Sequence, residues 1–416
     1  MIKMKKCLVV PGPFLPYNDT ITQLVYKQLR LLPLEYDVCA LSNEVDEKLQ
    51  EQLQKDPCFK KFHIHYTDKY NNVLFSIKNV HIYKGLEHMK RYIKTAIDMY
   101  DNHEYLYTSS WPCYTTRVGV ELKKQHPNLV WLANFSDPIN HSPYKYDQET
   151  YKSYHIFEKI AFKLYCKYYV VDEDEANAFE HADWLIFICE EQRDFMIEQY
   201  LKYFGKVSKQ KLLFKSLIVP LNYIPEWNDL IPSKKAPHNP VFTLSHFGRV
   251  YGLRIIEEFI YAVQLFIKKH PDTPFVIEQY GEFRKSDIAL IKKLGLSNYF
   301  KIHNKVPYAE CIEKMHQSDA VLLFDTILDE DTIQPYLPSK IMEYSLLKKD
   351  VLAVTTSKSP SYRILKESNA IACKYDRNDI LKGLEDLLLN HRESKVHYAY
   401  TNKQAIQSLL HVLETK

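Results

Sequence analysis

Short apolar runs alternate with helix-like stretches through almost the whole chain, and this alternation constrains its fold more than any other feature. In the first half we predict strands at residues 6–11, 36–41, 62–66, 105–108, 129–135, 183–189 and 216–220. In the second half we predict them at 241–247, 274–279, 300–303, 321–325, 351–354 and 370–373. Strands that alternate with helices form parallel sheets covered on both faces. The predicted fold class is therefore α/β, with two doubly wound, Rossmann-like domains.

Helical patterns fill the intervals between the predicted strands. We expect a helix at about 20–32, capped by Asp19 or Thr20, and others at about 77–100, 115–124 and 191–203. Charge-rich helical sequence also precedes residue 181. The clearest apolar stripe with helical spacing consists of Ile256, Phe259, Ile260, Val263, Phe266 and Ile267. The last segment, about 396–416, is also predicted to be helical.

A proline-rich break separates the two series of strands. Pro225, Pro232, Pro237 and Pro240 interrupt it among mixed charges. Because 416 residues is long for one core, we predict one domain at 1–222, a linker at 223–240 and a second domain at 241–399. The tail, 400–416, is expected to cross back to the first domain. Ligands of open α/β sheets bind beyond the carboxyl ends of the strands, so we expect the two domains to face each other across a ligand-binding cleft.

The composition is that of a soluble globular protein, with 46% hydrophobic and 26% charged residues. The net charge of +3 predicts no large basic face and therefore no nucleic-acid partner. The eight cysteines are scattered without a Cys-x-x-Cys pair, which favours free thiols in a reducing compartment over disulfides or zinc. No apolar run approaches the roughly 20 residues of a membrane span. We predict a cytoplasmic protein, with peripheral contact at the inner face of the membrane as a further option.

Residues 335–344, with the sequence PYLPSKIMEY, form the first candidate binding stretch. Pro338 suits the first turn of a helix because its missing N–H would be unsatisfied there. Ser339 and the backbone amides beside it are placed to meet an anion, and Lys340 adds a positive charge. Glu343, about one turn later, is suited to accept hydrogen bonds from a sugar hydroxyl. The alternative is an ordinary αβ unit with a well-formed helix start.

The second candidate is Gly248-Arg-Val-Tyr-Gly-Leu-Arg254, which follows the first strand of the second domain. Glycine permits a close approach of the backbone, and the two arginines bracket the start of a helix, which favours diphosphate binding. The segment is neither a Gly-x-Gly-x-x-Gly motif nor a Walker motif, so dinucleotide or ATP binding loses support. The alternative is a basic turn between a strand and a helix. His246, just before the turn, is either a core histidine or part of the site.

Three segments in this order, FGRVYGLR, KVPYAECIEKMHQSDAVLLF and LPSKIMEYSLLKKDVLAV, resemble the nucleotide-sugar domain of retaining glycosyltransferases of family 4, which have the GT-B fold. The first half is similar, more weakly, to the acceptor domain of the capsule and exopolysaccharide branch, through YLYTSS, VWLANFSDP, HADWLIFICEEQRDFM and SLIVPLNY. The resemblance implies an enzyme that transfers a sugar, of hexosyltransferase type, from a nucleoside diphosphate sugar to a glycan or lipid-linked acceptor in surface polysaccharide synthesis. It implies no resident cofactor and no metal.

The resemblance also assigns roles to residues of the second domain. Arg249 and Lys340 would contact the donor diphosphate and support catalysis, with further donor contacts from Arg254, Gly248, Gly281, Val306, Ser339 and Glu343. Glu343 matches the second glutamate of the family's Glu-x7-Glu motif and would hold the ribose. The first glutamate falls at Pro335, so the contacts to the donor sugar must differ here.

In the first domain, Asp137 ends a predicted strand and is the candidate to act on the acceptor hydroxyl or to contact the transferred sugar. The alternative for Asp137 is a structural Asp-Pro turn. His141 and Asn18 are further candidates for acceptor or sugar contacts, and the alternative for His141 is a solvated loop histidine. Lysines and apolar residues in 202–215 predict contact with an anionic membrane, with a solvated loop as the alternative.

Two other functions remain open from the sequence. A sugar-nucleotide epimerase can share this fold, and it would need carboxylates and a histidine deep in the site. A non-catalytic subunit that binds the donor and partners an active transferase is the second, and Pro335 in place of the expected glutamate motivates it.

Overall fold

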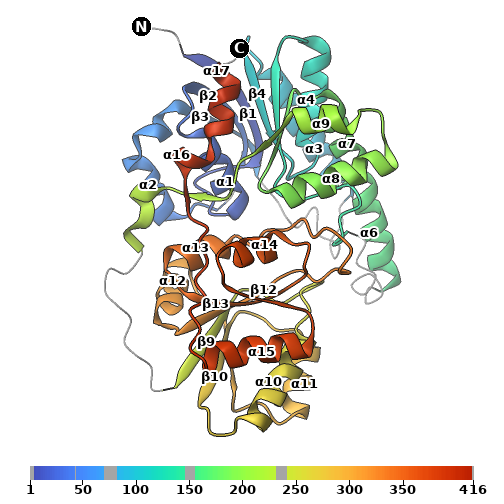
Figure 1. The fold of residues 1–416 in the computed structure, drawn as a ribbon. Helices are drawn as coiled ribbons and strands as arrows, with labels where there is room; N and C mark the ends of the chain where they lie inside the picture. The colour runs from blue at the N-terminus through green and yellow to red at the C-terminus, as the bar shows by residue number, and fades with distance from the viewer. Residues whose placement is uncertain (1–3, 43, 70–81, 146–154, 231–240, 415–416) are drawn as a thin grey trace. The chain divides into compact units, whose positions relative to one another are not determined.

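The computed structural model describes residues 4–42, 44–69, 82–145, 155–230 and 241–414. The chain divides into two compact units (Figure 1). Unit 1 contains residues 1–222 together with 400–416, and unit 2 contains residues 223–399. Each unit is built around a parallel sheet, which confirms the predicted α/β class with two Rossmann-like domains.

Unit 1 holds a seven-stranded sheet with the order β3-β2-β1-β4-β5-β6-β7, in which all neighbouring strands are parallel. The strands are β1 (Lys5–Pro13), β2 (Leu34–Ser42), β3 (Phe62–Lys69), β4 (Tyr105–Ser109), β5 (Val130–Asn134), β6 (Trp184–Phe187) and β7 (Ser216–Ile218). β1 lies inside the sheet, and its residues from Cys7 onward are buried. The long apolar run of β1 therefore reflects burial on both faces of the sheet.

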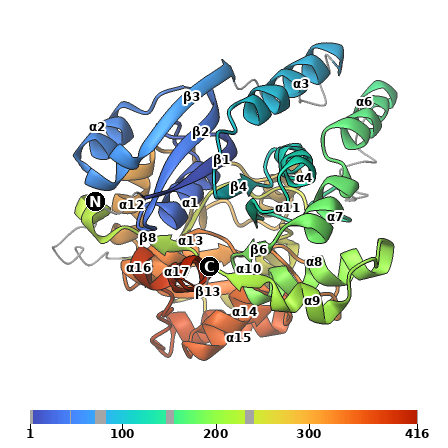
Figure 2. The ribbon, with the colours of Figure 1, turned by 90° about the horizontal axis from the view of Figure 1, so that it is seen from above.

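The helices of unit 1 cover both faces of this sheet. They are α1 (Thr20–Leu29), α2 (Glu47–Lys55), α3 (Ile82–Asp98), α4 (Thr115–Gln125), α6 (Ile156–Tyr168), α7 (Asp172–His181), α8 (Glu190–Tyr203) and α9 (Lys209–Phe214), with a 3₁₀ turn η1 (Pro57–Lys61). Figure 2 shows α3, α4, α6 and α7 on one side and α1 and α8 on the other. Asp19 caps α1 as predicted, because its Oδ1 accepts a 2.7 Å hydrogen bond from the N–H of Ile21.

The C-terminal segment returns to unit 1, as predicted. The expected single helix is wrong, however, since β15 (Tyr400–Thr401) pairs with β8 (Asn222–Tyr223) and two short helices follow, α16 (Asn402–Ala405) and α17 (Gln407–Glu414). Pairing with β8 holds the backbone of β15 extended, so a helix begins only after Thr401, whose side chain caps α16. The Ser408 hydroxyl donates to the carbonyl of Ile218 at 3.2 Å and ties α17 to β7.

Unit 2 holds a six-stranded parallel sheet with the order β11-β10-β9-β12-β13-β14. The strands are β9 (Phe242–Phe247), β10 (Phe275–Tyr280), β11 (Phe300–His303), β12 (Ala320–Phe324), β13 (Asp350–Thr355) and β14 (Ile371–Lys374). The helices are α10 (Glu257–Lys269), α11 (Lys285–Lys293), α12 (Tyr308–Gln317), α13 (Lys340–Leu346), α14 (Pro360–Glu367) and α15 (Arg377–Leu388).

The predicted stripe on α10 is part of the core of unit 2. Phe259, Ile260, Val263 and Phe266 are fully buried in one apolar cluster with residues of the sheet and of α15. The predicted linker 223–240 begins with β8 and a 3₁₀ turn, η4 (Pro225–Leu230), and its residues 231–240 lie outside the described part. The start of the predicted helix 77–100 also lies outside it. Among the described residues, no helix has the length and apolar character needed to cross a bilayer.

Candidate functional site

The loop that follows β9 brings together two predicted donor residues that lie far apart in the sequence. Gly248 has a φ of 118°, which favours glycine, and its N–H donates to the carbonyl of Tyr280 at 2.8 Å. A Cβ added to Gly248 would lie only 2.9 Å from Nζ of Lys340, at the start of α13. The absent side chain therefore leaves the space that the Lys340 ammonium occupies.

Buried polar residues on β9 and β10 fix the position of this glycine. The Gln279 amide donates to the carbonyl of Gly248 at 2.7 Å, and its Oε1 lies 2.7 Å from Nδ1 of His246. A Cβ on Gly281 would meet that same carbonyl oxygen at 2.5 Å, so the two glycine loops are in close contact. Since Oε1 of Gln279 can only accept, Nδ1 of His246 carries the proton.

His246 is a buried, neutral histidine. Its exposed fraction is 4%, and its pKa is lowered to about 3 by burial and by the positive charges of Lys340 and Arg254. It therefore belongs to the interior of unit 2, and it lies directly under the site. The sequence left open whether His246 is a core histidine or part of the site. It is a core histidine by its burial, and its pKa is lowered by two of the site's cations.

Three cations gather at this end of the sheet. Lys340 is half-buried, and its pKa is lowered first by burial and then by the charge of Arg254, while Glu343 acts in the opposite direction. The Arg254 guanidinium lies 5.2 Å from the ring centre of Tyr251, and its Nε has no hydrogen-bond partner within the described chain. Arg249 is exposed, with its Nε 3.1 Å from the exposed carboxylate of Glu282. Three positive side chains close together are suited to a dianionic ligand.

Glu343 lies on α13 one turn after Lys340, as predicted. Its Oε1 accepts a 3.2 Å hydrogen bond from the hydroxyl of Tyr308, the first residue of α12. Val306 lies two residues earlier, half-buried in the loop after β11. Ser339 precedes α13, and its side chain makes no capping hydrogen bond. The structure therefore joins Glu343 to the Val306 loop through Tyr308, which the sequence analysis did not single out.

Pro335 is buried, and the residue before it is bonded to a buried acid. Gln334 donates from Nε2 to Oδ1 of Asp325 at 2.7 Å, and Oδ2 of Asp325 accepts from the Thr355 hydroxyl at 3.0 Å. Burial raises the pKa of Asp325. Asp325 directly follows β12, so a carboxyl group is present near the stretch in which the expected glutamate is replaced by proline.

The three residues predicted in unit 1 differ in their surroundings. Asp137 is exposed in the bend after β5. Asn18 is bonded on both ends of its amide, to Asp46 and to Gln23, each at 2.7 Å. His141 stacks on Tyr203 with ring centres 3.4 Å apart and lies 3.6 Å from a carboxylate oxygen of Asp172. Burial lowers the pKa of His141. His141 is therefore a packed residue and not a solvated loop histidine.

A buried glutamate supports the loop that carries Asp137 and His141. Oε2 of Glu175, on α7, accepts from the N–H groups of Ile139 at 2.7 Å and Asn140 at 3.2 Å. Burial raises the pKa of Glu175 to about 8. From the sequence, this run of acids was predicted only to be charge-rich and helical. Asp174 and Glu175 are the buried acids of this run, and Asp174 pairs with Arg117 at 2.8 Å. Only the fold shows which acids point inward, so no local signal in the sequence identifies Glu175.

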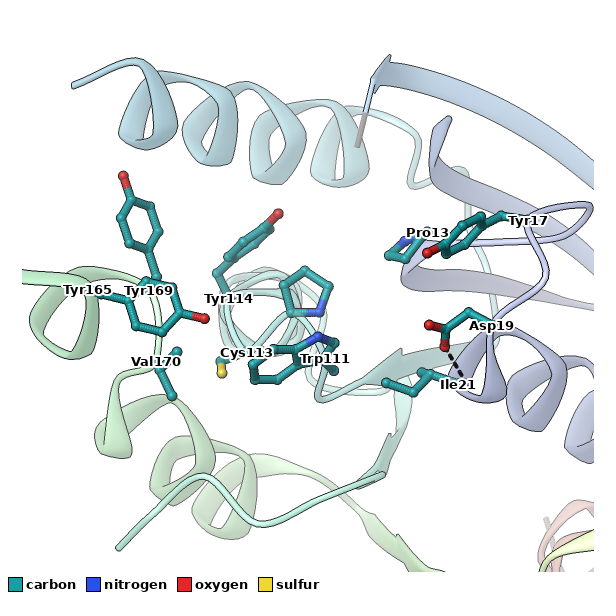
Figure 3. Close-up of a pocket in the computed structure, with 11 residues that line it drawn as sticks. Pro13, Tyr17, Asp19, Ile21, Trp111, Cys113, Tyr114, Tyr165, Tyr169 and Val170 are labelled. Carbon is teal, nitrogen blue, oxygen red and sulfur yellow. Dashed lines mark hydrogen bonds between the residues drawn. The ribbon is translucent and has the colours of Figure 1, made fainter. Parts of the chain in front are cut away.

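Unit 1 also contains a cavity of about 300 Å³ that the sequence analysis missed (Figure 3). Its lining is aromatic and comes from three chain segments: Pro13, Tyr17, Asp19 and Ile21; Trp111, Pro112, Cys113 and Tyr114; and Tyr165, Tyr169 and Val170. Figure 3 shows the first and third groups on opposite sides, with the second between them. Clustered aromatic rings and one carboxylate are suited to a sugar ring, which stacks on its apolar face and hydrogen-bonds at its edge.

The stretch 202–215 forms the end of α8, a short loop and α9. Phe214 is 82% exposed, whereas Leu212 is buried. Lys206 pairs with Glu180 at 3.1 Å, and Lys215 donates to the carbonyl of Ala182, with its pKa lowered to about 8 by burial. The predicted membrane contact of this stretch thus rests on fewer exposed groups than the sequence suggested, and it stays a prediction.

No protein-family model matches the chain, and no curated protein matches it by sequence. Solved structures do match it over nearly its whole length. The E. coli trehalose-6-phosphate structure with bound UDP-2-fluoro glucose has a TM-score of 0.56 at 12% identity, covering 99% of this chain and 96% of that one. A proposed UDP-N-acetylglucosamine 2-epimerase from Listeria monocytogenes gives 0.56 at 10%, covering 99% and 96%. The lipopolysaccharide outer core galactosyltransferase WaaB gives 0.53 at 9%, covering 96% and 93%.

The chain has a GT-B fold. At these identities the likeness establishes the fold alone, and the chemistry must be argued from the residues. The structures that share the fold include both sugar transferases and an epimerase, so the fold leaves two reaction classes to be separated by experiment.

Proposed function

We propose that this chain is a retaining glycosyltransferase of family 4, of hexosyltransferase type. It would move a sugar from a nucleoside diphosphate sugar to a glycan or lipid-linked acceptor in surface polysaccharide synthesis. The observation that carries the proposal is the placement of the Lys340 ammonium in the space left by Gly248, beside Arg254, at the carboxyl end of β9. Open α/β sheets bind their ligands at that end.

In this proposal, Lys340, Arg254 and Arg249 hold the donor diphosphate. Their charges stabilise the negative charge that develops on the diphosphate as its bond to the sugar breaks. Gly248 allows the phosphate to approach the backbone, and Glu343 accepts from the ribose hydroxyls, with Tyr308 fixing the orientation of its carboxylate. The departing diphosphate takes the proton of the acceptor hydroxyl, so no separate strong base is needed.

Unit 1 supplies the acceptor side in this proposal. The aromatic cavity would take a sugar ring of the acceptor, and Asp137, exposed at the end of β5, would contact the acceptor hydroxyl or the transferred sugar. The side-chain amide of Asn18 is hydrogen-bonded to Asp46 and Gln23 and thereby holds the loop between β1 and α1, which forms one wall of that cavity. WaaB, a galactosyltransferase of an outer-core lipopolysaccharide with the same fold, supports a role in surface polysaccharide synthesis.

The first experiment is a thermal-shift screen with nucleoside diphosphates and their sugars, because a ligand that binds the native state raises the melting temperature. The donor identified in this way is then used, with a radiolabelled sugar, to assay transfer to lipid and glycan fractions. Lys340→Ala should abolish the shift, whereas Lys382→Ala, which removes an exposed lysine on α15, should keep it. A full shift with Lys340→Ala would contradict the proposed site.

The epimerase remains the second candidate, because the required residue types are present and buried. His246 lies one residue before the end of β9, and Asp325 directly follows the neighbouring strand β12; both are buried. Incubating the protein with the donor alone separates the two functions. A new sugar nucleotide identifies the epimerase, while transfer that requires an acceptor identifies the transferase. Donor binding without either reaction would instead support a non-catalytic donor-binding subunit.

A further inference from the structure

Helix α6 in unit 1 exposes large apolar side chains at its N-terminal end. Ile156 is 67% exposed, Phe157 80% and Ile160 51%. Single exposed apolar residues are common on protein surfaces, but three on two turns of one helix form a patch that water solvates poorly. No residue of α6 from Ile156 to Tyr168 is fully buried, so this helix lies on the surface of unit 1.

Lysines continue the same face of the helix. Ile156, Ile160, Lys163 and Lys167 follow one another at spacings of three or four residues and are all exposed, so they form one line along the outer side of α6. The only acid on the helix is Glu158, whose carboxylate accepts from the N–H of His155 in a capping hydrogen bond of 2.8 Å. The outer face is thus apolar in its first half and basic in its second.

The opposite face of α6 belongs to the aromatic cavity. Tyr165 lines that cavity, and Tyr169 and Val170, directly after the helix, line it too. Figure 3 shows the two tyrosines together at one side of it. One helix therefore has an outer face with exposed apolar side chains and an inner face that shapes a candidate ligand pocket.

We propose that the outer face of α6 binds the surface of an anionic lipid bilayer. An interfacial helix lies in the plane of the membrane, with its apolar side chains among the upper acyl chains and its lysines at the level of the anionic headgroups. The outer face of α6 carries both kinds of side chain. A protein partner would need a matching groove with acids at one end, whereas an anionic bilayer provides both properties everywhere on its surface.

The proposal extends the proposed function without depending on its chemistry. Binding through α6 would hold the cavity next to the membrane, where the head of a lipid-linked acceptor lies. Lipid binding is assigned to α6 and donor binding to unit 2. An experiment can therefore contradict one of the two proposals and leave the other standing.

The test is co-sedimentation of the full chain with vesicles of phosphatidylcholine containing about one-third phosphatidylglycerol, compared with pure phosphatidylcholine. We expect binding to the mixed vesicles only, weakened by salt. Lys163→Glu with Lys167→Glu should lower the partition coefficient about tenfold or more, since each lysine near such a surface contributes about fivefold. Phe157→Asp with Ile160→Glu should abolish binding.

Matched controls lie on unit 2. Ile302→Glu alters an apolar residue that is 43% exposed on β11, and Lys292→Glu with Lys293→Glu reverses two exposed lysines on α11. Both controls should bind like the unaltered chain, and circular dichroism should show that every variant is folded. Failure of the unaltered chain to bind the mixed vesicles, or equal loss in the controls, overturns the proposal. So does a dimer in gel filtration that the Phe157 and Ile160 variant disrupts, if vesicle binding is absent.

Discussion

Each unit has a glycine with a positive φ near the carboxyl end of its first strand, but the space beside the two glycines is filled differently. Gly12 in unit 1 has a φ of 79° and Gly248 in unit 2 a φ of 118°. A Cβ on Gly12 would lie 2.2 Å from Cδ of Pro112, whereas one on Gly248 would lie 2.9 Å from Nζ of Lys340. An apolar ring therefore closes the first loop, and an ammonium group occupies the second.

This difference separates a structural use of glycine from a chemical one. In unit 1 the close approach of Gly12 to Pro112 packs two loops together, and the N–H of Gly12 is bonded to the Tyr92 hydroxyl at 3.0 Å. In unit 2 the same kind of approach involves the Lys340 ammonium, whose pKa is lowered first by burial and then by the charge of Arg254. A glycine near the end of the first strand therefore serves packing in unit 1 and, in the proposed function, ligand binding in unit 2.

The largest expected effect comes from removing the charge and keeping the volume. Lys340→Met should lower the transfer rate and the donor affinity, with kcat/KM falling about 100-fold or more, because a cation that meets developing negative charge is lost. The melting temperature should fall little, or rise, since the ammonium is half-buried among like charges. Steady-state kinetics and calorimetric titration with the donor measure both changes. A variant with unaltered donor affinity would falsify the assignment of Lys340.

Adding a methyl group at each glycine tests the comparison directly. Gly248→Ala should destabilise the protein by about 1–3 kcal/mol, because it imposes a positive φ on a residue with a Cβ. Gly12→Ala should destabilise it by more, because its Cβ would also overlap the ring of Pro112. Only Gly248→Ala should also weaken donor binding, by displacing Lys340. Urea unfolding and donor titration of the two variants provide the measurement. Equal effects on donor binding would remove the distinction between the loops.

Glu175 in unit 1 and His246 in unit 2 predict opposite dependences of stability on pH. The pKa of Glu175 rises from 4.5 to about 8, so the native state binds more protons between these values and stability falls as the pH rises through that range. Glu175→Gln should reduce this fall, with equal stability near pH 5 and higher stability than the parent chain near pH 8. Tryptophan fluorescence suits the measurement because Trp111, Trp131 and Trp184 all lie in unit 1.

His246 serves as the counterpart of Glu175. Its pKa falls from 6.5 to about 3, so the unfolded state binds more protons in that range and stability rises with pH up to about 6.5. A parent chain whose stability is flat from pH 5 to 8, or a Gln variant with the same slope, would show that Glu175 ionises normally.

The smallest expected effect concerns the exposed ion pair of Arg249 with Glu282. Glu282→Gln removes a carboxylate that competes with the donor diphosphate for Arg249. Donor affinity should rise about threefold at low salt, which is the typical strength of an exposed pair, and the gain should vanish at high salt. Titrations at two salt concentrations measure it. A fall in affinity would instead assign Glu282 to the ligand.

The sequence was sufficient to predict the architecture because the apolar runs that indicate strands and the three-to-four-residue spacing that indicates helices are both local patterns. Every predicted strand is present, and the stripe that includes Phe259 and Phe266 is buried as expected. Errors occurred where a partner distant in sequence decides the structure, as at Tyr400, which pairs with β8 and cannot be helical. The two-residue strands are too short to produce a pattern.

The candidate site was predictable where a short segment contains its own chemistry. The glycine and arginines of 248–254 and the lysine and glutamate of 340–343 were named from their spacing, and the structure brings Gly248 and Lys340 into contact. The cavity, Glu175 and the bond from Tyr308 to Glu343 were missed, because each depends on segments that only the folded chain brings together.

The return of residues 400–416 to unit 1 has a consequence for biosynthesis. Unit 2 is one continuous stretch of chain, 223–399, whereas unit 1 lacks α16 and α17 until the ribosome has also made all of unit 2. The domain translated second can therefore complete its fold first, reversing the usual order from the N-terminus. Until then α17 does not cover β7, and the carbonyl of Ile218 lacks its hydrogen bond from Ser408. The first half of the nascent chain is therefore the part that needs protection from aggregation.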